Sequence, residues 1–452
     1  MKGRVEKVKK LLLLLCAALM ASFMVACGGE TEEEAEGTEE EAGNENAEDG
    51  EDASSGEEEI TLRMSWWGSQ GRHDMTNEII ELYEEENPNV TIQPDFTGFD
   101  GYFEKMATQA AGGNLPDIMQ QNHGEFVNQY ANQDQLADLQ PFVDDGTIDV
   151  EGVGETIMQS GEVNETLVGI PTGVNALAGL YDPEMIEEAG AEMPHEDWTW
   201  EEFETMAETV HEETGEYGVR LMEPGNMFEY YVREKGQRLF NDDGSGLGYE
   251  DDQLLVDYLT MNKEMVDEGV APGYDTIGEI QGLEDELLIH QEAPIDFRWT
   301  NQLGTMTDAS GRTIEMTPLP GENNDDGMYL KPAMLWSIGK NSEHKEEAAK
   351  FINFYTNQVE VYEIAGSDRG VPISPEIQEE MSEDLDETEQ KVYDYIDHIT
   401  DNSSPIDSNY PAEAAEVLNS LADIDELVMY GQLEPEQGAE QFRTEAESIL
   451  GQ

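Results

Sequence analysis

The chain has 452 residues, of which 103 are Asp or Glu and only 22 are Lys or Arg, giving a formal net charge of −81 at pH 7. This acidity disfavours nucleic acid and anionic membrane surfaces as partners. It is spread over the whole chain, which one binding site does not explain, and we interpret it as halophilic adaptation, in which salt screens the carboxylates. Most individual Asp and Glu residues are therefore expected to be solvated surface charges.

The first 26 residues have the pattern of an export signal. Lys2, Arg4 and further lysines precede the apolar run LLLLLCAALMASFMVA, which is too short and wrongly flanked for a stable membrane span. Cys27 follows the small residue Ala26, and MVAC resembles a bacterial lipobox, with Met24 where leucine is commoner. We predict a signal peptide over 1–26 and lipidation of Cys27. The alternative is an ordinary signal peptide followed by an incidental cysteine.

Residues 27–59 have a different composition. After Cys27 they contain no basic and no large apolar residue, so they cannot bury enough surface to offset their ordering entropy. We expect a disordered acidic tether that holds a folded body at the outer face of the cell membrane, in contact with the membrane through the lipid alone. Both cysteines of the chain lie at or before residue 27, which excludes disulfides and cysteine-ligated metals from the body.

The body begins at Ile60 with alternating strand and helix patterns. The β-rich segment ITLRMSWWG is followed by a helical pattern with Ile79, Ile80 and Tyr83 on one face and Pro88 at its end. Further strand and helix patterns follow in turn, in NVTIQPDF, GYFEKMATQAAGG and LPDIMQQ. This order is typical of an α/β lobe.

Later segments continue the mixture of strands and helices. DWTWEEFETMAETVHEETG predicts a helix with Thr199 as its cap and Glu202 three residues later, as in a capping box. Two later strands are expected in EAPIDFRWTNQL and KPAMLWSIG, a helix in EHKEEAAKFINFYTN, and helices after Ser382 almost to the end. About 390 residues are enough for two lobes with separate cores.

No enzyme motif is found in the body. It contains no nucleophile elbow, P-loop, zinc-protease helix or dinucleotide fingerprint, and the seven histidines lack ligand spacing. We therefore predict no catalytic residue, no metal site and no cofactor. Two alternatives stay open, because a suitably spaced carboxylate pair is enough for glycoside cleavage: a secreted polysaccharide-active hydrolase, or a structural surface lipoprotein.

The order of several motifs is more specific than any one of them. WWG, YFEKMATQAAGGNLPDIM, GIPTGVNALAGLYDPEMIEEAG, DWTWEEF, MVDEGVAP, PIDFRW, SIGKNSEHKEEAAKFINFYTN and RGVPIS follow one another in an arrangement that resembles the family 1 extracellular solute-binding proteins. The resemblance covers residues 60–452 and implies a two-lobed α/β fold of the periplasmic-binding-protein type, class II, with a ligand cleft between the lobes. It also implies a monomeric receptor for a saccharide. The implied partners are the two transmembrane permease subunits and the cytoplasmic ATPase of an ABC importer.

Mapping that fold onto the chain gives expected boundaries. Lobe 1 would comprise 60–171 with 300–335, and lobe 2 would comprise 172–299 with 336–452. Crossings between the lobes would lie near residues 171–175, 298–301 and 337–341. Gly173 and Gly339 would be flexible there, or would be ordinary turn residues.

Candidate ligand contacts follow from the chemistry of sugars, which present an apolar C–H face and a rim of hydroxyls. Trp66 and Trp67 end the first strand, where open α/β sheets bind ligands, and alternation allows at most one of them to face the cleft. Asn122 and His123 follow a predicted strand and are candidates for hydroxyl contacts. The resemblance adds Trp299, with core packing as the alternative, and one of Phe228, Tyr230 and Tyr231.

The remaining tryptophans and two arginines are assigned by context. Trp198 and Trp200 flank the helix cap and are expected to pack in the core. For Trp336, a place in the cleft and a place in the core both remain alternatives. Arg298 and Arg369 are expected either to form salt bridges or to bind ligand hydroxyls or a sugar carboxylate.

Overall fold

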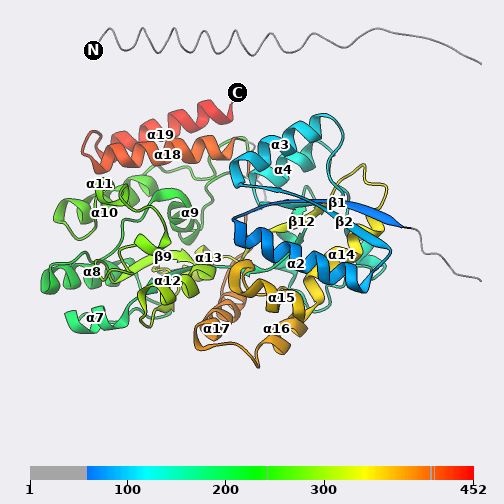
Figure 1. Ribbon diagram of the computed structural model, residues 1–452. Helices are drawn as coiled ribbons and strands as arrows, with labels where there is room; N and C mark the ends of the chain where they lie inside the picture. The colour runs from blue at the N-terminus through cyan, green and yellow to red at the C-terminus, as the bar shows by residue number, and fades with distance from the viewer. Residues whose placement is uncertain (1–58, 242, 408–409, 412, 452) are drawn as a thin grey trace, which may run out of the picture. The chain divides into compact units, whose positions relative to one another are not determined.

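A computed structural model describes residues 59–451, apart from 242, 408–409 and 412. The predicted signal peptide, the lipidation site at Cys27 and almost all of the tether lie outside the described residues. The strands fall into two main sheets, and we call the groups of elements built on them lobe 1 and lobe 2 (Figure 1). None of the described helices is long and apolar enough to cross a membrane.

Lobe 1 is built on a five-stranded sheet in the order β2-β1-β3-β12-β6. β1 is parallel to β2 and β3, whereas β12 is antiparallel to β3 and β6. The strands are β1 (Ile60–Trp67), β2 (Val90–Thr97), β3 (Ile118–Gln121), β6 (Ile170–Pro171) and β12 (Leu335–Ile338), and a small hairpin joins β4 (Glu162–Val163) to β5 (Thr166–Leu167). The helices of this part are α2 (Gln70–Glu86), α3 (Phe99–Ala111), α4 (Glu125–Asn132), α5 (Gln140–Asp144), α6 (Glu155–Gln159), α14 (Lys345–Asn357), α15 (Val359–Ala365) and α16 (Pro375–Met381).

Trp66 and Trp67 show how this sheet is covered. Adjacent strand residues point to opposite faces, and the two indoles belong to different hydrophobic clusters. Trp66 packs against Phe96 and His73, with ring centroids 5.0 and 6.3 Å away. Trp67 packs against Tyr102 at 5.0 Å. Helices on both faces therefore bury the two side chains, which are 0% and 3% exposed.

Lobe 2 is built on a three-stranded antiparallel sheet in the order β10-β8-β9. Its strands are β8 (Leu177–Tyr181), β9 (Ile295–Trp299) and β10 (Glu315–Thr317). Its helices are α7 (Pro183–Ala189), α8 (Trp200–Thr214), α9 (Pro224–Glu234), α10 (Gln253–Glu268), α11 (Tyr274–Ile277), α12 (Leu303–Ser310), α13 (Asn324–Gly327), α17 (Glu387–Asp401), α18 (Ala414–Met429) and α19 (Pro435–Leu450), with short 3-10 turns at Leu283–Asp285 and Thr300–Gln302. The last two helices lie side by side next to α10 (Figure 1).

The predicted capping box of α8 is confirmed. The Thr199 side chain accepts a hydrogen bond from the Glu202 amide, and the Glu202 carboxylate accepts one from the Thr199 amide at 2.7 Å. Trp198 beside it is buried and donates from Nε1 to the carbonyl of Pro318 at 2.7 Å, so it supports the fold as expected.

The boundaries between the lobes differ from those expected. β10 pairs with β8, so the segment 300–330 stays with lobe 2, and the chain returns to lobe 1 only at β12. Two of the expected crossings are therefore wrong: residues 298–301 lie at the end of β9 within lobe 2, and residues 337–341 lie at the end of β12 within lobe 1. The segments that pass between the sheets pair with one another: β7 (Val174–Asn175) pairs with β11 (Lys331–Pro332), and Val174 also bridges to Val371.

Candidate ligand-binding site

A cavity of about 170 Å³ is lined by residues of both lobes. We call it the interlobe cavity. Lobe 1 contributes the loop after β3 and the start of α4, and lobe 2 contributes one face of α9 and the segment before β11. The lining residues used below are Asn122, His123, Phe126, Asn226, Glu229, Tyr329, Lys331 and Tyr410.

A second cavity, of about 280 Å³, lies beside it in lobe 2. We call it the lobe 2 cavity. Its walls include Arg220, Glu223, Arg298, Trp299 and Gln302, and Asn226 lines both cavities. Trp299 also connects the two, because Lys331 Nζ lies 4.7 Å from the centroid of its ring and the Tyr329 ring lies 6.2 Å away.

Local sequence explains how α9 presents polar groups to these cavities. Pro224 starts the helix, where its missing N–H costs no hydrogen bond. Asn226 and Glu229, three residues apart, share the face that lines the interlobe cavity. Phe228 and Tyr230 point into the core instead, and both are 0% exposed.

Burial determines the charge of the groups around the interlobe cavity. The pKa of His123 is lowered to about 3 by burial and, secondarily, by Lys331, so its imidazole is neutral. Burial raises the pKa of Glu229, whose carboxylate accepts a hydrogen bond from the Tyr410 hydroxyl. Burial also lowers the pKa of Lys331, and the charge of Glu229 partly opposes this shift. The cavity thus combines a neutral imidazole with one potential cation and one potential anion.

Tyr410 connects the two lobes at this cavity. Its hydroxyl binds Glu229 of lobe 2, and its carbonyl accepts a hydrogen bond from Asn128 Nδ2 of lobe 1 at 3.1 Å. Its ring lies 6.3 Å from that of His123 and 5.6 Å from that of Phe240.

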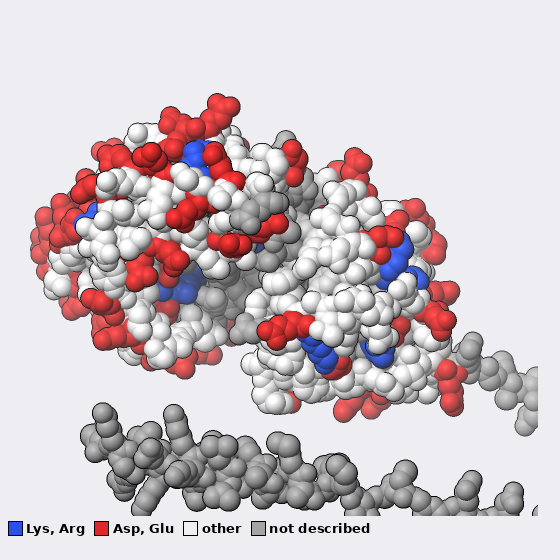
Figure 2. All heavy atoms as spheres, turned by 90° about the horizontal axis from the view of Figure 1, so that it is seen from above, with Lys and Arg blue, Asp and Glu red and all other residues white. Residues whose placement is uncertain are grey.

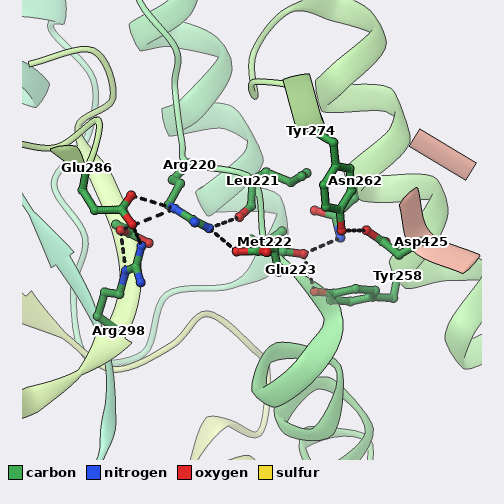
Figure 3. A network of polar contacts seen from close by, with 11 residues as sticks. Arg220, Leu221, Met222, Glu223, Tyr258, Asn262, Tyr274, Glu286, Arg298 and Asp425 are labelled. Atoms are coloured by element: carbon green, nitrogen blue, oxygen red, sulfur yellow. Dashed lines mark hydrogen bonds and ion pairs between the residues drawn. The ribbon is translucent and has the colours of Figure 1, made fainter. Parts of the chain in front are cut away.

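A network of charged groups fixes the wall of the lobe 2 cavity (Figure 3). Arg220 donates from Nε to Glu286 at 2.9 Å and from Nη1 to Glu223 at 2.7 Å. Arg298 donates from Nε to Asp296 at 2.7 Å and from Nη2 to Glu286. Of the two roles expected for Arg298, a salt bridge or a ligand contact, the salt bridge is therefore the one observed. The carboxylates of this wall are tied to guanidinium groups, which keeps their positions fixed.

The structure brings together some predicted contacts and separates others. Asn122, His123 and Trp299 line the two cavities. Trp66, Trp67, Phe228 and Tyr230 are instead buried in hydrophobic clusters. Helices cover both faces of β1, and Phe228 and Tyr230 lie on the side of α9 that packs into the core. Tyr231, 8% exposed, packs on Trp200 at 5.5 Å. Arg369 is 1% exposed beside the crossing segments, and Trp336 is buried against Tyr355 at 5.4 Å.

Sequence reasoning missed six of the eight residues named above for the interlobe cavity: Phe126, Asn226, Glu229, Tyr329, Lys331 and Tyr410. The spacing of Asn226 and Glu229 on an otherwise aromatic helix was a usable signal. Lys331, a rare cation next to a proline, was another. No sequence signal pointed to Tyr410, because its position depends on how the two lobes pack around it.

Among residues 59–451, apart from the few not described, no cluster of three His, Cys, Asp or Glu side chains is arranged to hold a metal ion.

Comparisons with known proteins agree with this architecture. A family model for bacterial extracellular solute-binding proteins matches residues 73–360. A family 1 extracellular solute-binding protein from Alicyclobacillus acidocaldarius has a solved structure that is 28% identical, with a TM-score of 0.74 over 88% of this chain and 100% of that one. A periplasmic oligogalacturonide binding protein from Yersinia enterocolitica, solved with saturated digalacturonic acid, is 26% identical, with a TM-score of 0.70 over 87% of this chain and 99% of that one.

A curated relative extends the comparison to a transport system. An Escherichia coli (strain K12) protein, YcjN, provisionally named an ABC transporter periplasmic-binding protein, is 21% identical over 298 residues. The match spans 63% of this chain and 66% of that protein, just under two thirds of its length. The expected resemblance and the two-lobed α/β fold are thus confirmed. Since the family model covers more than half of the chain, the protein belongs to the bacterial extracellular solute-binding proteins.

Proposed function

We propose that the protein captures an oligosaccharide outside the cell membrane and delivers it to an ABC importer. The observation that carries this proposal is the pairing of aromatic surface with hydroxyl-binding groups in two adjoining cavities. Trp299 and Phe126 offer flat faces, and Asn122 and Glu229 offer amide and carboxyl groups. A sugar presents complementary surfaces, an apolar ring face and a polar rim.

The two cavities favour a ligand of more than one sugar ring. They share Asn226, and Trp299 is in contact with Lys331 of the neighbouring cavity, so an oligosaccharide can occupy both. The related protein from Yersinia enterocolitica, which binds an oligogalacturonide, supports a ligand of this class.

Delivery would depend on closure of the lobes. The interlobe cavity has walls from both lobes, so a ligand contacting both binds the closed state more tightly and shifts the population toward it. The closed form would then dock on two transmembrane permease subunits driven by a cytoplasmic ATPase. The protein itself would act as a monomer held at the outer face of the membrane by the lipid on Cys27.

The cavity chemistry supports binding over hydrolysis. Glu223 and Asp296 are each in a salt bridge with an arginine, and Glu229 is hydrogen-bonded to Tyr410. Glycoside cleavage requires one carboxyl group as an acid beside a second that acts as base or nucleophile. Because other side chains already engage these three carboxyl groups, they are not arranged as the free acid and base pair that cleavage needs.

A thermal-shift screen tests the proposal directly. The mature protein in 1 M salt would be melted with a panel of neutral and acidic oligosaccharides. A ligand present at 100 times its Kd should stabilise the fold by about 2.7 kcal/mol. The bound saccharide should be recovered unchanged by chromatography. Steady release of cleavage products over many turnovers would contradict the receptor function.

A further inference from the structure

Lys331 occupies an unusual place in this site. It lies on β11, one of the strands that cross between the lobes, where it pairs with Asn175. Its side chain is half-buried and lines the interlobe cavity, and its ammonium lies over the Trp299 ring. Trp299 lines the lobe 2 cavity, so the same indole borders that cavity and contacts the ammonium.

The neighbouring cations are all neutralised, and Lys331 is not. Arg220 is paired with Glu286, Arg298 with Asp296, and Arg233 with Asp407 at 2.7 Å. The described residues provide no ion pair and no hydrogen bond to the Lys331 ammonium. A cation without a partner carboxylate is notable in a chain with 103 acidic residues.

Glu229 is not an ion-pair partner of Lys331. Its carboxylate influences Lys331 electrostatically, but it is engaged by the Tyr410 hydroxyl and forms no ion pair with the ammonium. His123, in the same cavity, is a neutral imidazole and adds no charge. Partial burial of a cation that forms no ion pair is unfavourable, so an anion brought by the ligand would offset the lost hydration of Lys331.

We infer that the saccharide carries an anionic group and that Lys331 is the residue that binds it. This inference rests on the proposed saccharide-binding function. One sugar ring would stack on Trp299 in the lobe 2 cavity, and the anionic group of the adjacent unit would lie beside Lys331 in the interlobe cavity. A carboxylate and a sulfate ester share the required chemistry, a compact oxyanion with a single charge. Because Lys331 is on a crossing strand, the ligand's charge would be recognised next to the segments that move when the lobes close.

The test uses ligands that differ in charge but hardly in shape. Calorimetric titration would compare digalacturonic acid with its dimethyl ester, a sulfated galactose disaccharide and the neutral oligosaccharides of the panel. The wild-type protein should bind an acidic probe at least about tenfold more tightly than the ester, since a hydrogen bond to a charged group is worth about 1.5–3 kcal/mol. A preference between digalacturonic acid and the sulfated probe would identify the anionic group.

Variants connect that preference to Lys331. Lys331→Met should weaken the affinity for acidic ligands by about 10- to 100-fold. Its affinity for the ester should stay within about threefold of the wild-type value. Lys331→Arg, which keeps the charge, should retain most of the preference. Lys340→Met is the matched control, because Lys340 pairs with the exposed Asp134 at 3.0 Å away from the cavities, and it should change neither affinity. Melting curves would establish that each variant is folded.

The possible failures are distinguishable. If the tightest ligand is neutral and Lys331→Met does not alter its affinity, the inference is overturned and the saccharide receptor stands. If no saccharide of either charge binds, the proposed function itself fails.

Discussion

Val174 and Val371 are joined by a reciprocal pair of backbone hydrogen bonds, 2.8 Å from the Val174 amide and 3.0 Å from the Val371 amide. Val174 also faces Pro332 of β11, so three segments far apart in the sequence pair where the chain passes between the lobes. The connection between the lobes is therefore a small region of paired strands. Its backbone groups are satisfied, so bending there must preserve the pairing.

Replacing Gly173 should destabilise this connection between the lobes. A Cβ atom at residue 173 would lie 2.2 Å from the carbonyl oxygen of Arg369 and 2.9 Å from that of Val371. Because the obstacles are backbone atoms, Gly173→Ala must displace a crossing strand, and we expect it to lower the free energy of unfolding by about 1–3 kcal/mol. Denaturant unfolding measures this loss.

Gly71→Ala is the matched control. Gly71 is in the first turn of α2, and the nearest atom to its added Cβ is 3.9 Å away. Removing glycine's extra freedom in the unfolded chain should make this variant as stable as the wild type or up to about 1 kcal/mol more stable. Equal losses in the two variants would contradict the steric argument for Gly173.

Trp299→Ala should reduce ligand affinity more than stability. The Trp299 side chain is half-buried, lines the lobe 2 cavity and is covered by Lys331. Loss of a desolvated aromatic contact is expected to cost about 1–2 kcal/mol of binding, roughly ten- to thirtyfold in Kd. Calorimetric titration measures the affinity, and a denaturant melt of the same variant measures its stability.

Trp66→Ala should show the opposite behaviour. Trp66 is 0% exposed and packs on Phe96, so its truncation leaves a cavity in lobe 1 at a cost of about 3–5 kcal/mol in stability. If Trp66→Ala weakened binding in a protein of unchanged stability, Trp66 and not Trp299 would be the ligand contact.

The sequence was sufficient to predict the elements that have strong local signals. The Thr199 and Glu202 capping box was readable because its two hydrogen bonds join residues three positions apart. The opposite orientations of Trp66 and Trp67 followed from strand alternation. Their burial did not, because it depends on helices that come from elsewhere in the chain to cover both faces of β1.

The site and the lobe boundaries depend more on long-range packing. β10 has only three residues, too few for a recognisable pattern, yet its pairing with β8 keeps residues 300–330 in lobe 2. Similarly, the aromatic residues of α9 attracted attention as ligand contacts, whereas the structure turns them to the core and Glu229 to the cavity. Which face of a helix meets the ligand is set by the sheet and the helices it packs on.

Asp425 should make stability depend on pH in an unusual direction. It is fully buried on α18, where the Tyr274 hydroxyl donates to its Oδ2 at 2.6 Å (Figure 3), and burial raises its pKa to about 7. A carboxyl group whose pKa is higher in the folded state than in the unfolded state binds more protons when folded. The stability that comes from this extra proton binding is fully present below about pH 4 and is lost as the pH rises through about 7.

Asp425→Asn removes this titration. The difference in unfolding free energy between the variant and the wild type should shift in favour of the variant by about 2–4 kcal/mol between pH 4 and pH 8. Asp257→Asn, at an exposed position of α10, is the control for the loss of one negative charge. Parallel pH profiles for wild type and Asp425→Asn would show that Asp425 does not titrate in this range.

Cys27→Ser should release the protein from membranes. The residues between Cys27 and the body offer no other apolar attachment, so lipid on this cysteine would be the anchor. Fractionation of cells expressing each form should find the wild type with membranes and the variant in the soluble or secreted fraction. Cys16→Ser, within the predicted signal peptide, should leave membrane retention unchanged. Retention of the Cys27→Ser variant would contradict the lipoprotein prediction.

Added salt should raise the melting temperature. Asp and Glu groups are numerous on the face seen in Figure 2, densest on its left part and mostly at the rim of its right part, and they far outnumber the Lys and Arg groups. The formal net charge of the chain is −81. The mutual repulsion of the carboxylates acts over a Debye length of about 30 Å at 0.01 M salt and about 3 Å at 1 M. Screening therefore relieves repulsion that is stronger in the compact folded state than in the expanded unfolded chain. Melting curves in sodium chloride and in tetramethylammonium chloride should rise together over this range, because screening depends on ionic strength alone. A rise with sodium only would mean that the carboxylates bind specific cations, and a flat or falling curve in both salts would refute the halophilic interpretation.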